Sequence, residues 1–162
     1  MREADVLVQI QRNFADRPGV LPAARAMSHF GEHALGWMGL GAAGALVQPA
    51  KREQWIRLAG AAFCSHAISV VLKRIVRRKR PNDPRIKVGV ATPSKLSFPS
   101  SHATSTAAAL VSLAYICGKP WPLAGVPVMM FSRMVLGVHY PSDVAAGAGI
   151  GVATAVIMKG NK

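Results

Sequence analysis

The residue spacing most suggestive of chemistry lies in the last third of the chain. Ser132-Arg133 is followed after five residues by His139 and after three more by Asp143. A carboxylate beside an imidazole can accept a hydrogen bond from one ring nitrogen and make the other more nucleophilic. Pro141 lies between the two and indicates a turn that enters a helix. The pattern predicts an activated His139 oriented by Asp143, and the alternative is a structural His–Asp pair that caps a helix.

A second group, Pro99-Ser100-Ser101-His102, immediately precedes the apolar stretch 103–118. Serines in front of an apolar run are signals for the start of a helix. A helix start has unpaired backbone amides and a positive partial charge, so it can bind an oxyanion, with the two hydroxyls as further donors. His102 beside it can protonate a leaving group. The alternative interpretation is an ordinary helix cap.

The densest positive run of the chain begins at Lys73 and ends, after six residues, with Arg80-Pro81. Arginine offers a planar fork and lysine a mobile point charge, and both suit phosphate recognition. The alternatives are contact with anionic lipid headgroups or a bias in membrane orientation. We do not expect nucleic-acid binding, because neither stacking aromatics nor a known binding motif accompanies the run.

Composition then defines the elements that must hold these residues. The chain has 162 residues, a net charge of +13, 51% hydrophobic residues and two cysteines, which excludes disorder and a disulfide scaffold. We expect one domain, 1–162. Stretches without charged residues predict an all-α, integral membrane helical bundle of about five spanning helices: 34–50, 58–72, 96–118, 120–132 and 144–158. Several have only 13 to 17 residues, so a buried soluble core is the alternative.

The segment 1–30 differs from the rest. Apolar residues at helical spacing, Val6, Leu7, Ile10 and Phe14, alternate with charged ones and predict an amphipathic interfacial helix. We expect no removable signal peptide. Arg17-Pro18-Gly19 ends the helix, and three prolines between 80 and 98 predict a loop there. Small residues four apart, such as Gly147 and Gly151, favour close helix packing and make a homo-oligomer plausible.

Threading the chain as five spans places all three groups at one membrane face. Lys73 and Arg80 follow the second span, His102 opens the third, and His139 lies between the fourth and fifth. A pocket that combines cations, hydroxyls and two histidines suits phosphoryl transfer, in which catalysis is positioning and charge stabilisation.

At this point the sequence resembles the type-2 phosphatidic acid phosphatases, which share a histidine site with vanadium haloperoxidases and certain acid phosphatases. The three family motifs K-x6-R-P, P-S-G-H and S-R-x5-H-x3-D correspond in order to residues 73–81, 99–102 and 132–143. Ser101 stands where the family usually has glycine. Its backbone amide is retained, so the change concerns backbone dihedral angles and pocket width.

The resemblance implies a role for each matching residue. His139 would attack phosphorus to form a phosphohistidine, Asp143 would orient it, and His102 would protonate the departing oxygen and later activate water. The phosphate oxygens would be held by Lys73, Arg80, Ser100, the Ser101 amide and Arg133. No divalent metal or other cofactor is implied. The expected activity is that of a lipid phosphate phosphatase, a phosphoric monoester hydrolase, whose partners are the bilayer and its lipid substrate.

The charge distribution predicts the membrane orientation. Fourteen of the twenty Lys and Arg fall on the site's face and six on the other, so the positive-inside rule predicts a multi-pass protein of the cell membrane with a cytoplasmic site. A cytoplasmic site favours a lipid phosphate made there over a carrier recycled outside. The chain is also similar to small actinobacterial members of the family, and this resemblance implies a polyprenyl-linked substrate such as decaprenylphosphoryl-5-phosphoribose 5′-phosphate of cell-wall arabinan precursor synthesis. Phosphatidic acid, phosphatidylglycerophosphate and polyprenyl diphosphate are alternatives.

Two interpretations from other classes stay open. One is a non-catalytic membrane protein that binds anionic lipid through residues 73–87, and the other is a soluble haloperoxidase-like enzyme. His29 and His33, with Glu32 between them, superficially suggest a metal site, but we expect interfacial polarity instead because a third ligand is missing. His66 lies in an apolar stretch and is interpreted as a hydrogen-bonded interior histidine.

Overall fold

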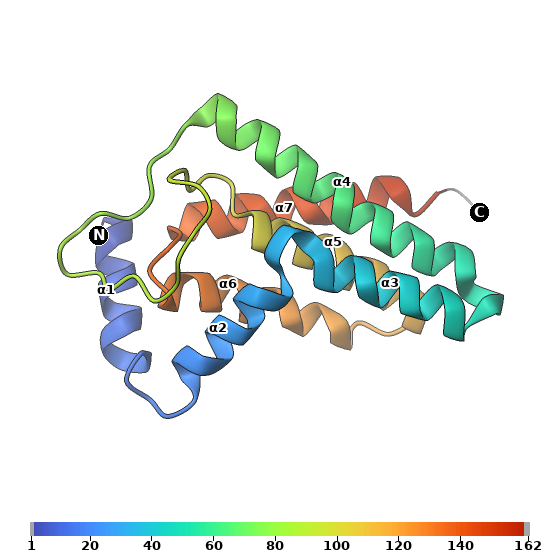
Figure 1. The fold of residues 1–162 in the computed structure, drawn as a ribbon, viewed down its shortest axis with the longest axis horizontal. Coiled ribbons are helices and arrows are strands. Elements are labelled where there is room, and N and C mark those ends of the chain that lie inside the picture. The colour runs from blue at the N-terminus through green and yellow to red at the C-terminus, as the bar shows by residue number, and fades with distance from the viewer. Residues whose placement is uncertain (1, 161–162) are drawn as a thin grey trace.

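The structure is a computed structural model that describes residues 2–160. Its helices, joined by short 3-10 turns, are α1 (Glu3–Phe14), α2 (Val20–Phe30), α3 (Leu35–Val47), α4 (Arg52–Val76), α5 (Ser101–Cys117), α6 (Gly125–Val135) and α7 (Pro141–Met158). Helices α3 to α7 run along the long axis of the molecule, and α1 lies across one end (Figure 1). The described residues form no β-sheet, only an isolated bridge between Lys79 and Leu96, so the predicted all-α class is confirmed.

Helix α5 is the centre of the bundle, packed against both α4 and α7. Its inner turns carry mostly Ala, Ser and Thr, so neighbouring backbones approach closely. A Cβ atom on Gly147 of α7 would lie 2.7 Å from the Ser100 carbonyl oxygen, and one on Gly151 would lie 2.9 Å from the Ala108 nitrogen. The predicted close contact at these glycines is therefore confirmed, and it joins the two helices whose first turns carry motif residues.

The helix directions bring the motifs to one end of the bundle. Helices α4 and α6 end there, and α5 and α7 begin there (Figure 1). The predicted loop is present, because residues 77–100 contain no helix and cross this same end. The connections thus place side chains that are up to 70 residues apart in the chain next to one another.

The N-terminal segment forms two helices, α1 and α2, separated at Gly19, whose φ of 82° suits glycine. The apolar face of α1 does not stand free: Leu7 and Val8 pack against Ile86 of the 77–100 loop. Gln11 is buried as well, and its amide nitrogen donates to the carbonyl oxygens of Lys87 and Val135. Protein packing therefore accounts for the amphipathic pattern of α1, and its interfacial location stays a prediction.

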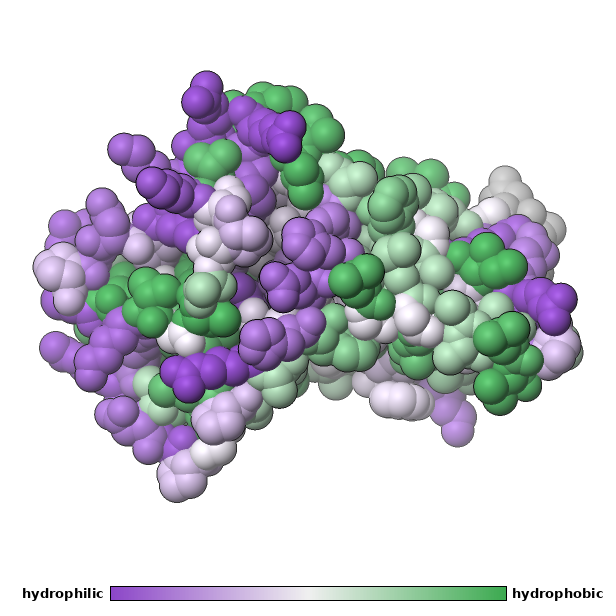
Figure 2. Space-filling view, viewed as in Figure 1, coloured by the Kyte–Doolittle hydropathy of each residue, from purple (hydrophilic) through white to green (hydrophobic). Residues whose placement is uncertain are grey.

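Membrane-spanning capacity differs among the helices. Among residues 2–160, two segments combine the length and hydropathy needed to cross a bilayer, Pro49–Val76 and Pro141–Met158. With 13 and 11 residues, α3 and α6 are shorter than the roughly 20 residues that a full crossing requires. The count of five spans therefore stays a prediction. Apolar side chains cover much of the half of the bundle away from the 77–100 loop, whereas polar ones dominate the loop end (Figure 2).

Candidate active site

A cavity of about 500 Å³ opens at the end of the bundle where the motifs meet. Six of the eight predicted site residues line it: Lys73, Arg80, Ser101, His102, Arg133 and His139. The other two, Ser100 and Asp143, are fully buried immediately behind its wall. The structure therefore brings together all three motifs that the sequence analysis identified.

His139 is held between a cation and a carboxylate. Its Nε2 lies 3.2 Å from Nη1 of Arg80, and its Nδ1 lies 3.7 Å from Oδ2 of Asp143. Because a guanidinium can only donate, Nε2 must be the accepting nitrogen, which places the ring proton on Nδ1, on the Asp143 side. The distance to Asp143 is longer than a hydrogen bond, and Nδ1 has no hydrogen-bond partner among the described residues.

The electrostatics of the cavity keep this imidazole neutral. Burial, and then the positive charges of Arg80 and Arg133, hold the pKa of His139 well below its usual value. A neutral ring with its lone pair on Nε2 is the form of histidine that can act as a nucleophile.

Asp143 is fixed by the turn that begins α7. Its Oδ2 accepts a hydrogen bond of 2.8 Å from the Tyr140 backbone amide, so the helix-capping interpretation is also correct for this carboxylate. Its Oδ1 accepts one of 2.8 Å from Nη1 of Arg78, and Arg78 in turn forms an ion pair with Glu3 of α1. Neither Arg78 nor Glu3 was predicted as a site residue. Arg78 lies 65 residues from Asp143 and 75 residues from Glu3 in the chain, and no sequence motif relates residues so far apart.

Ser28 of α2 is another residue that the sequence analysis missed. Its carbonyl oxygen lies 2.9 Å from Nε2 of His102, and its hydroxyl accepts a hydrogen bond of 2.7 Å from Arg133. A carbonyl can only accept, so Nε2 of His102 carries a proton and Nδ1 is the nitrogen left for proton exchange when the ring is neutral. Ser28 thus connects two motifs, although nothing in the sequence distinguishes it from other serines.

The cations are positioned mainly by backbone carbonyl groups. Lys73 donates to Pro99 at 3.0 Å and Leu96 at 3.3 Å, and Arg80 donates to Ser94 and to Val138, both at 2.8 Å. Carbonyl groups orient the positive charges without neutralising them, so the cavity suits an anion. Burial lowers the pKa of Arg80 to about 10, which leaves it protonated at neutral pH.

The two serines at the start of α5 face different neighbours. The Ser100 hydroxyl accepts from the Ala103 amide at 3.4 Å, as an N-cap residue does, and its role toward phosphate stays a prediction. The Ser101 hydroxyl lies 2.8 Å from that of Ser69 in α4, while Ser101 also lines the cavity. The side chain that replaces the family's usual glycine is therefore accommodated by a hydroxyl on the neighbouring helix.

His66 corrects one interpretation from the sequence. Its Nδ1 is buried without a hydrogen-bond partner in residues 2–160, so the histidine is not the satisfied interior residue that we expected. It lines the same cavity, as do His29, Glu32 and His33. No group of three or more potential metal ligands occurs in the described part of the chain.

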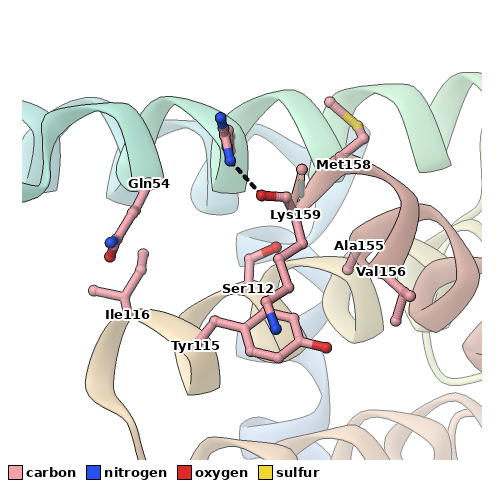
Figure 3. A pocket seen from close by; sticks show the side chains of 10 residues that line it. Gln54, Ser112, Tyr115, Ile116, Ala155, Val156, Met158 and Lys159 are labelled. Carbon is pink, nitrogen blue, oxygen red and sulfur yellow. Dashed lines mark hydrogen bonds between the residues drawn. The ribbon is translucent and has the colours of Figure 1, made fainter. Parts of the chain in front are cut away.

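A second cavity, of about 590 Å³, lies near the far ends of α4, α5 and α7 and contains no predicted site residue. Its charged groups already have partners (Figure 3). The Lys159 ammonium lies 4.2 Å from the centre of the Tyr115 ring, and Arg57 donates to the Lys159 carbonyl and pairs with Glu53. The histidine-lined cavity is therefore the candidate active site.

Comparison with known proteins agrees with this geometry. The sequence profile of the PAP2 superfamily matches residues 54–160, which include every motif residue. The chain belongs to the PAP2 superfamily. A decaprenylphosphoryl-5-phosphoribose phosphatase of Mycolicibacterium smegmatis is 60% identical over 145 residues, covering 90% of this chain and 81% of that protein. The Mycobacterium tuberculosis protein of the same name is 50% identical over 156 residues, covering 96% and 88%. The expected phosphatase class is confirmed.

Two solved structures of PAP2 proteins share the fold. One is a transmembrane PAP2-type phosphatidylglycerolphosphate phosphatase from Bacillus subtilis, with a TM-score of 0.73, 20% identity, and coverage of 96% of this chain and 83% of the other. The other is Aquifex aeolicus LpxE, also with a TM-score of 0.73 and 20% identity, and coverage of 96% and 93%. These similarities establish that the chain has the helical fold of these two proteins.

Proposed function

We propose that this PAP2 phosphatase hydrolyses the 5-phosphate monoester of a polyprenyl-linked phosphoribose, through a phosphohistidine formed at His139. The observation that carries the reaction type is the neutral His139, with Nε2 toward a cavity that Lys73, Arg80 and Arg133 make positive. The substrate follows from the two relatives with 60% and 50% identity, both named for decaprenylphosphoryl-5-phosphoribose.

The first half of the reaction transfers the phosphoryl group to the enzyme. Lys73, Arg80, Arg133 and the free amides at the start of α5 hold the phosphate oxygens and stabilise their charge in the transition state. Nε2 of His139 attacks phosphorus in line with the ester oxygen, a P–N bond forms, and the P–O bond to the lipid breaks. His102 enters this step as the imidazolium and gives its Nδ1 proton to the departing oxygen, while Nε2 keeps its proton toward Ser28. Asp143 stabilises the positive charge on the His139 ring.

The second half regenerates the enzyme. His102, now neutral, takes a proton from water, whose oxygen attacks phosphorus as the P–N bond breaks. Inorganic phosphate leaves and His139 recovers its lone pair. Ser100 supports this chemistry from behind the wall, because it caps the helix whose first amides contact phosphate. The side chains of Lys73, Arg80 and Arg133 supply the positive charge in both steps, so the proposal includes no metal ion.

We further propose that residues 1–162 form one membrane-embedded domain with five spans and a cytoplasmic active site. The distribution of Lys and Arg, fourteen against six, supports this orientation, as does the polar surface at the loop end (Figure 2). The test is a single cysteine at the exposed Val88, in a variant whose Cys64 and Cys117 are serine. We expect a membrane-impermeant maleimide to label it only after cells are permeabilised. Labelling in intact cells would place the site outside.

The experiment that tests the activity measures inorganic phosphate released by detergent-purified protein in EDTA. Four substrates are compared: polyprenyl-phosphoribose phosphate, polyprenyl phosphate, polyprenyl diphosphate and phosphatidic acid. We expect the phosphoribose lipid to be the best substrate and His139→Ala to abolish release. If another of the four lipids is the best substrate, the substrate assignment changes to that lipid. If His139→Ala releases as much phosphate as the wild type, His139 is not the nucleophile, and a protein that only binds anionic lipid is favoured.

A further inference from the structure

The active-site cavity extends beyond the three motifs into a region lined by polar side chains. We call this region the polar arm and define it by His29, Glu32, His33, His66 and Arg74. It is formed by the end of α2, the 3-10 turn Glu32–Ala34 and one face of α4. The phosphoryl-transfer chemistry proposed above uses none of these residues, so their presence in the cavity wall needs another explanation.

The polar arm is a built feature of the fold. His33 and Ala34 adopt φ angles of 51° and 60°, a left-handed conformation that non-glycine residues rarely take and that recurs at functional sites. The turn is pressed against the active site, because a Cβ atom on Gly31 would lie 2.8 Å from Cδ2 of His102. Glu32 and His33 on this turn are therefore held close to His102, the proposed general acid.

One nitrogen in the polar arm lacks a partner. The ring of His33 lies 5.8 Å from that of His66, measured between centroids, and Nδ1 of His66 is buried with no hydrogen-bond partner among residues 2–160. Buried polar atoms in folded proteins almost always have partners, so Nδ1 is an unmet hydrogen-bonding group beside the cavity, and Nε2 of the same ring is the nitrogen that can reach a ligand. Neutral imidazole both donates and accepts, and a carboxylate accepts, which is the combination that suits hydroxyl groups.

We propose that the polar arm binds the sugar of the substrate, with Glu32, His33 and His66 hydrogen-bonded to its hydroxyl groups and Arg74 paired with the phosphodiester that joins the sugar to the polyprenyl chain. This inference rests on the proposed function and extends it to specificity. The carboxylate of Glu32 disfavours an anionic group beside the 3-10 turn and favours neutral hydroxyl groups there. Arg74 follows Lys73 in α4, and both line the cavity. In this proposal Lys73 binds the phosphate monoester that is cleaved, and Arg74 binds the phosphodiester.

The test compares a substrate that carries the sugar with one that lacks it. Glu32→Gln and His33→Ala are assayed on polyprenyl-phosphoribose phosphate and on p-nitrophenyl phosphate, which reaches only the phosphate end of the cavity. We expect each variant to lose about 10- to 100-fold in kcat/KM on the sugar lipid, mainly through KM, as for removal of hydrogen bonds to a charged or buried group. Hydrolysis of p-nitrophenyl phosphate should stay within about twofold, which also shows that the variants fold.

A matched control and a second readout sharpen the result. Glu53→Gln removes an exposed carboxylate at the far end of the bundle and should change neither activity. Ribose 5-phosphate should inhibit p-nitrophenyl phosphate hydrolysis more strongly than glycerol 3-phosphate does in the wild type, and this difference should disappear in His33→Ala.

The outcomes separate this inference from the proposed function. If the wild type hydrolyses the sugar lipid and both variants have the same kcat/KM as the wild type, sugar binding by the polar arm is wrong and the proposed function stands. Equal losses on both substrates would also overturn it, because the arm would then serve the phosphate site. If the wild type releases no phosphate from the sugar lipid, both the proposed substrate and sugar binding by the polar arm are wrong.

Discussion

Arg78 and Asp143 form an ion pair of 2.8 Å that links the first catalytic motif to the third. The Asp143 carboxylate is completely buried, whereas the Arg78 side chain is partly exposed and reaches it from the 77–100 loop. With Oδ1 occupied by Arg78 and Oδ2 bonded to the Tyr140 amide, the carboxylate has a single orientation toward Nδ1 of His139. Arg78 is therefore a positioning residue that acts through Asp143.

Replacement of Arg78 should lower the rate more than it lowers binding. In Arg78→Gln the buried carboxylate loses its cationic partner and its orientation, so we expect kcat to fall about 10- to 100-fold, part of the 10²- to 10⁴-fold that a positioned acid–base group contributes. KM should change by less than about threefold, because Arg78 does not line the cavity. Steady-state kinetics on one lipid substrate provide both values.

Two further variants distinguish positioning from general disruption. Arg78→Lys keeps a cation near Asp143 and should recover part of kcat. Lys79→Gln removes the exposed neighbouring charge and should leave kcat unchanged. A purely structural role for Arg78 would instead lower the amount of folded protein while the kcat of the folded fraction stayed at the wild-type value.

The leaving group tests the role of His102. If His102 donates the proton to the departing oxygen, His102→Ala should lose about 10²- to 10⁴-fold on an alkyl phosphate lipid, because an alkoxide is a poor leaving group. The loss in kcat/KM on p-nitrophenyl phosphate should be less than about tenfold, because kcat/KM reports only the steps up to release of nitrophenolate, which departs without protonation. The ratio of the two losses is the measurement. Equal losses would assign His102 to phosphate binding instead of proton transfer.

The pH dependence follows from the environment of His139. The nucleophile must be neutral, and burial with neighbouring cations holds the pKa of His139 below 6.5. Activity therefore rises with pH through a pKa below 6.5, and kcat/KM should remain high at pH values where an ordinary histidine would be largely protonated. Measuring the pH profile of kcat/KM with two phosphate esters whose own pKa values differ distinguishes ionisation of the enzyme from ionisation of the substrate. An acid limb at or above pH 6.5 for both esters would contradict the assignment.

The contact between α5 and α7 can be tested at two glycines on the same helix. Gly147 touches Ser100 and Thr104, whereas a Cβ on Gly149 would meet nothing within 4 Å. Gly147→Val should displace the α7 turn that carries Asp143 and destabilise the protein by about 1–3 kcal/mol, roughly 2–4 °C in Tm per kcal/mol. Gly149→Val should leave both Tm and activity close to wild type. Similar effects at both positions would indicate a loss of helix flexibility instead of a clash.

Much of the site was accessible from the sequence because motif spacing and helix direction are local properties. Charge-free stretches indicated where helices run, and alternating directions then placed Lys73, His102 and His139 at one end. The structure confirms this arrangement. Close packing at Gly147 and Gly151 of α7 was also predictable, since glycines four residues apart mark one face of a helix, but the partner helix α5 was not.

Other features depend on contacts between distant segments and had no local signal. Ser28 and Glu3 reach the site only because α2 and α1 pack onto the 77–100 loop and α6. The apolar face of α1 indicated burial but not its partner, since protein and lipid both cover such a face. His66 was misinterpreted because the sequence shows an apolar neighbourhood and does not show whether a buried nitrogen has a partner.

The most direct test of the account is to trap the phosphorylated enzyme. Detergent-purified protein in EDTA is mixed with p-nitrophenyl phosphate labelled in its phosphate, quenched in alkali within one turnover, digested and mapped. We expect an acid-labile, alkali-stable label on the peptide that contains His139, present in His102→Ala and absent from His139→Ala. Label on another residue, or full phosphate release by His139→Ala, would contradict the account.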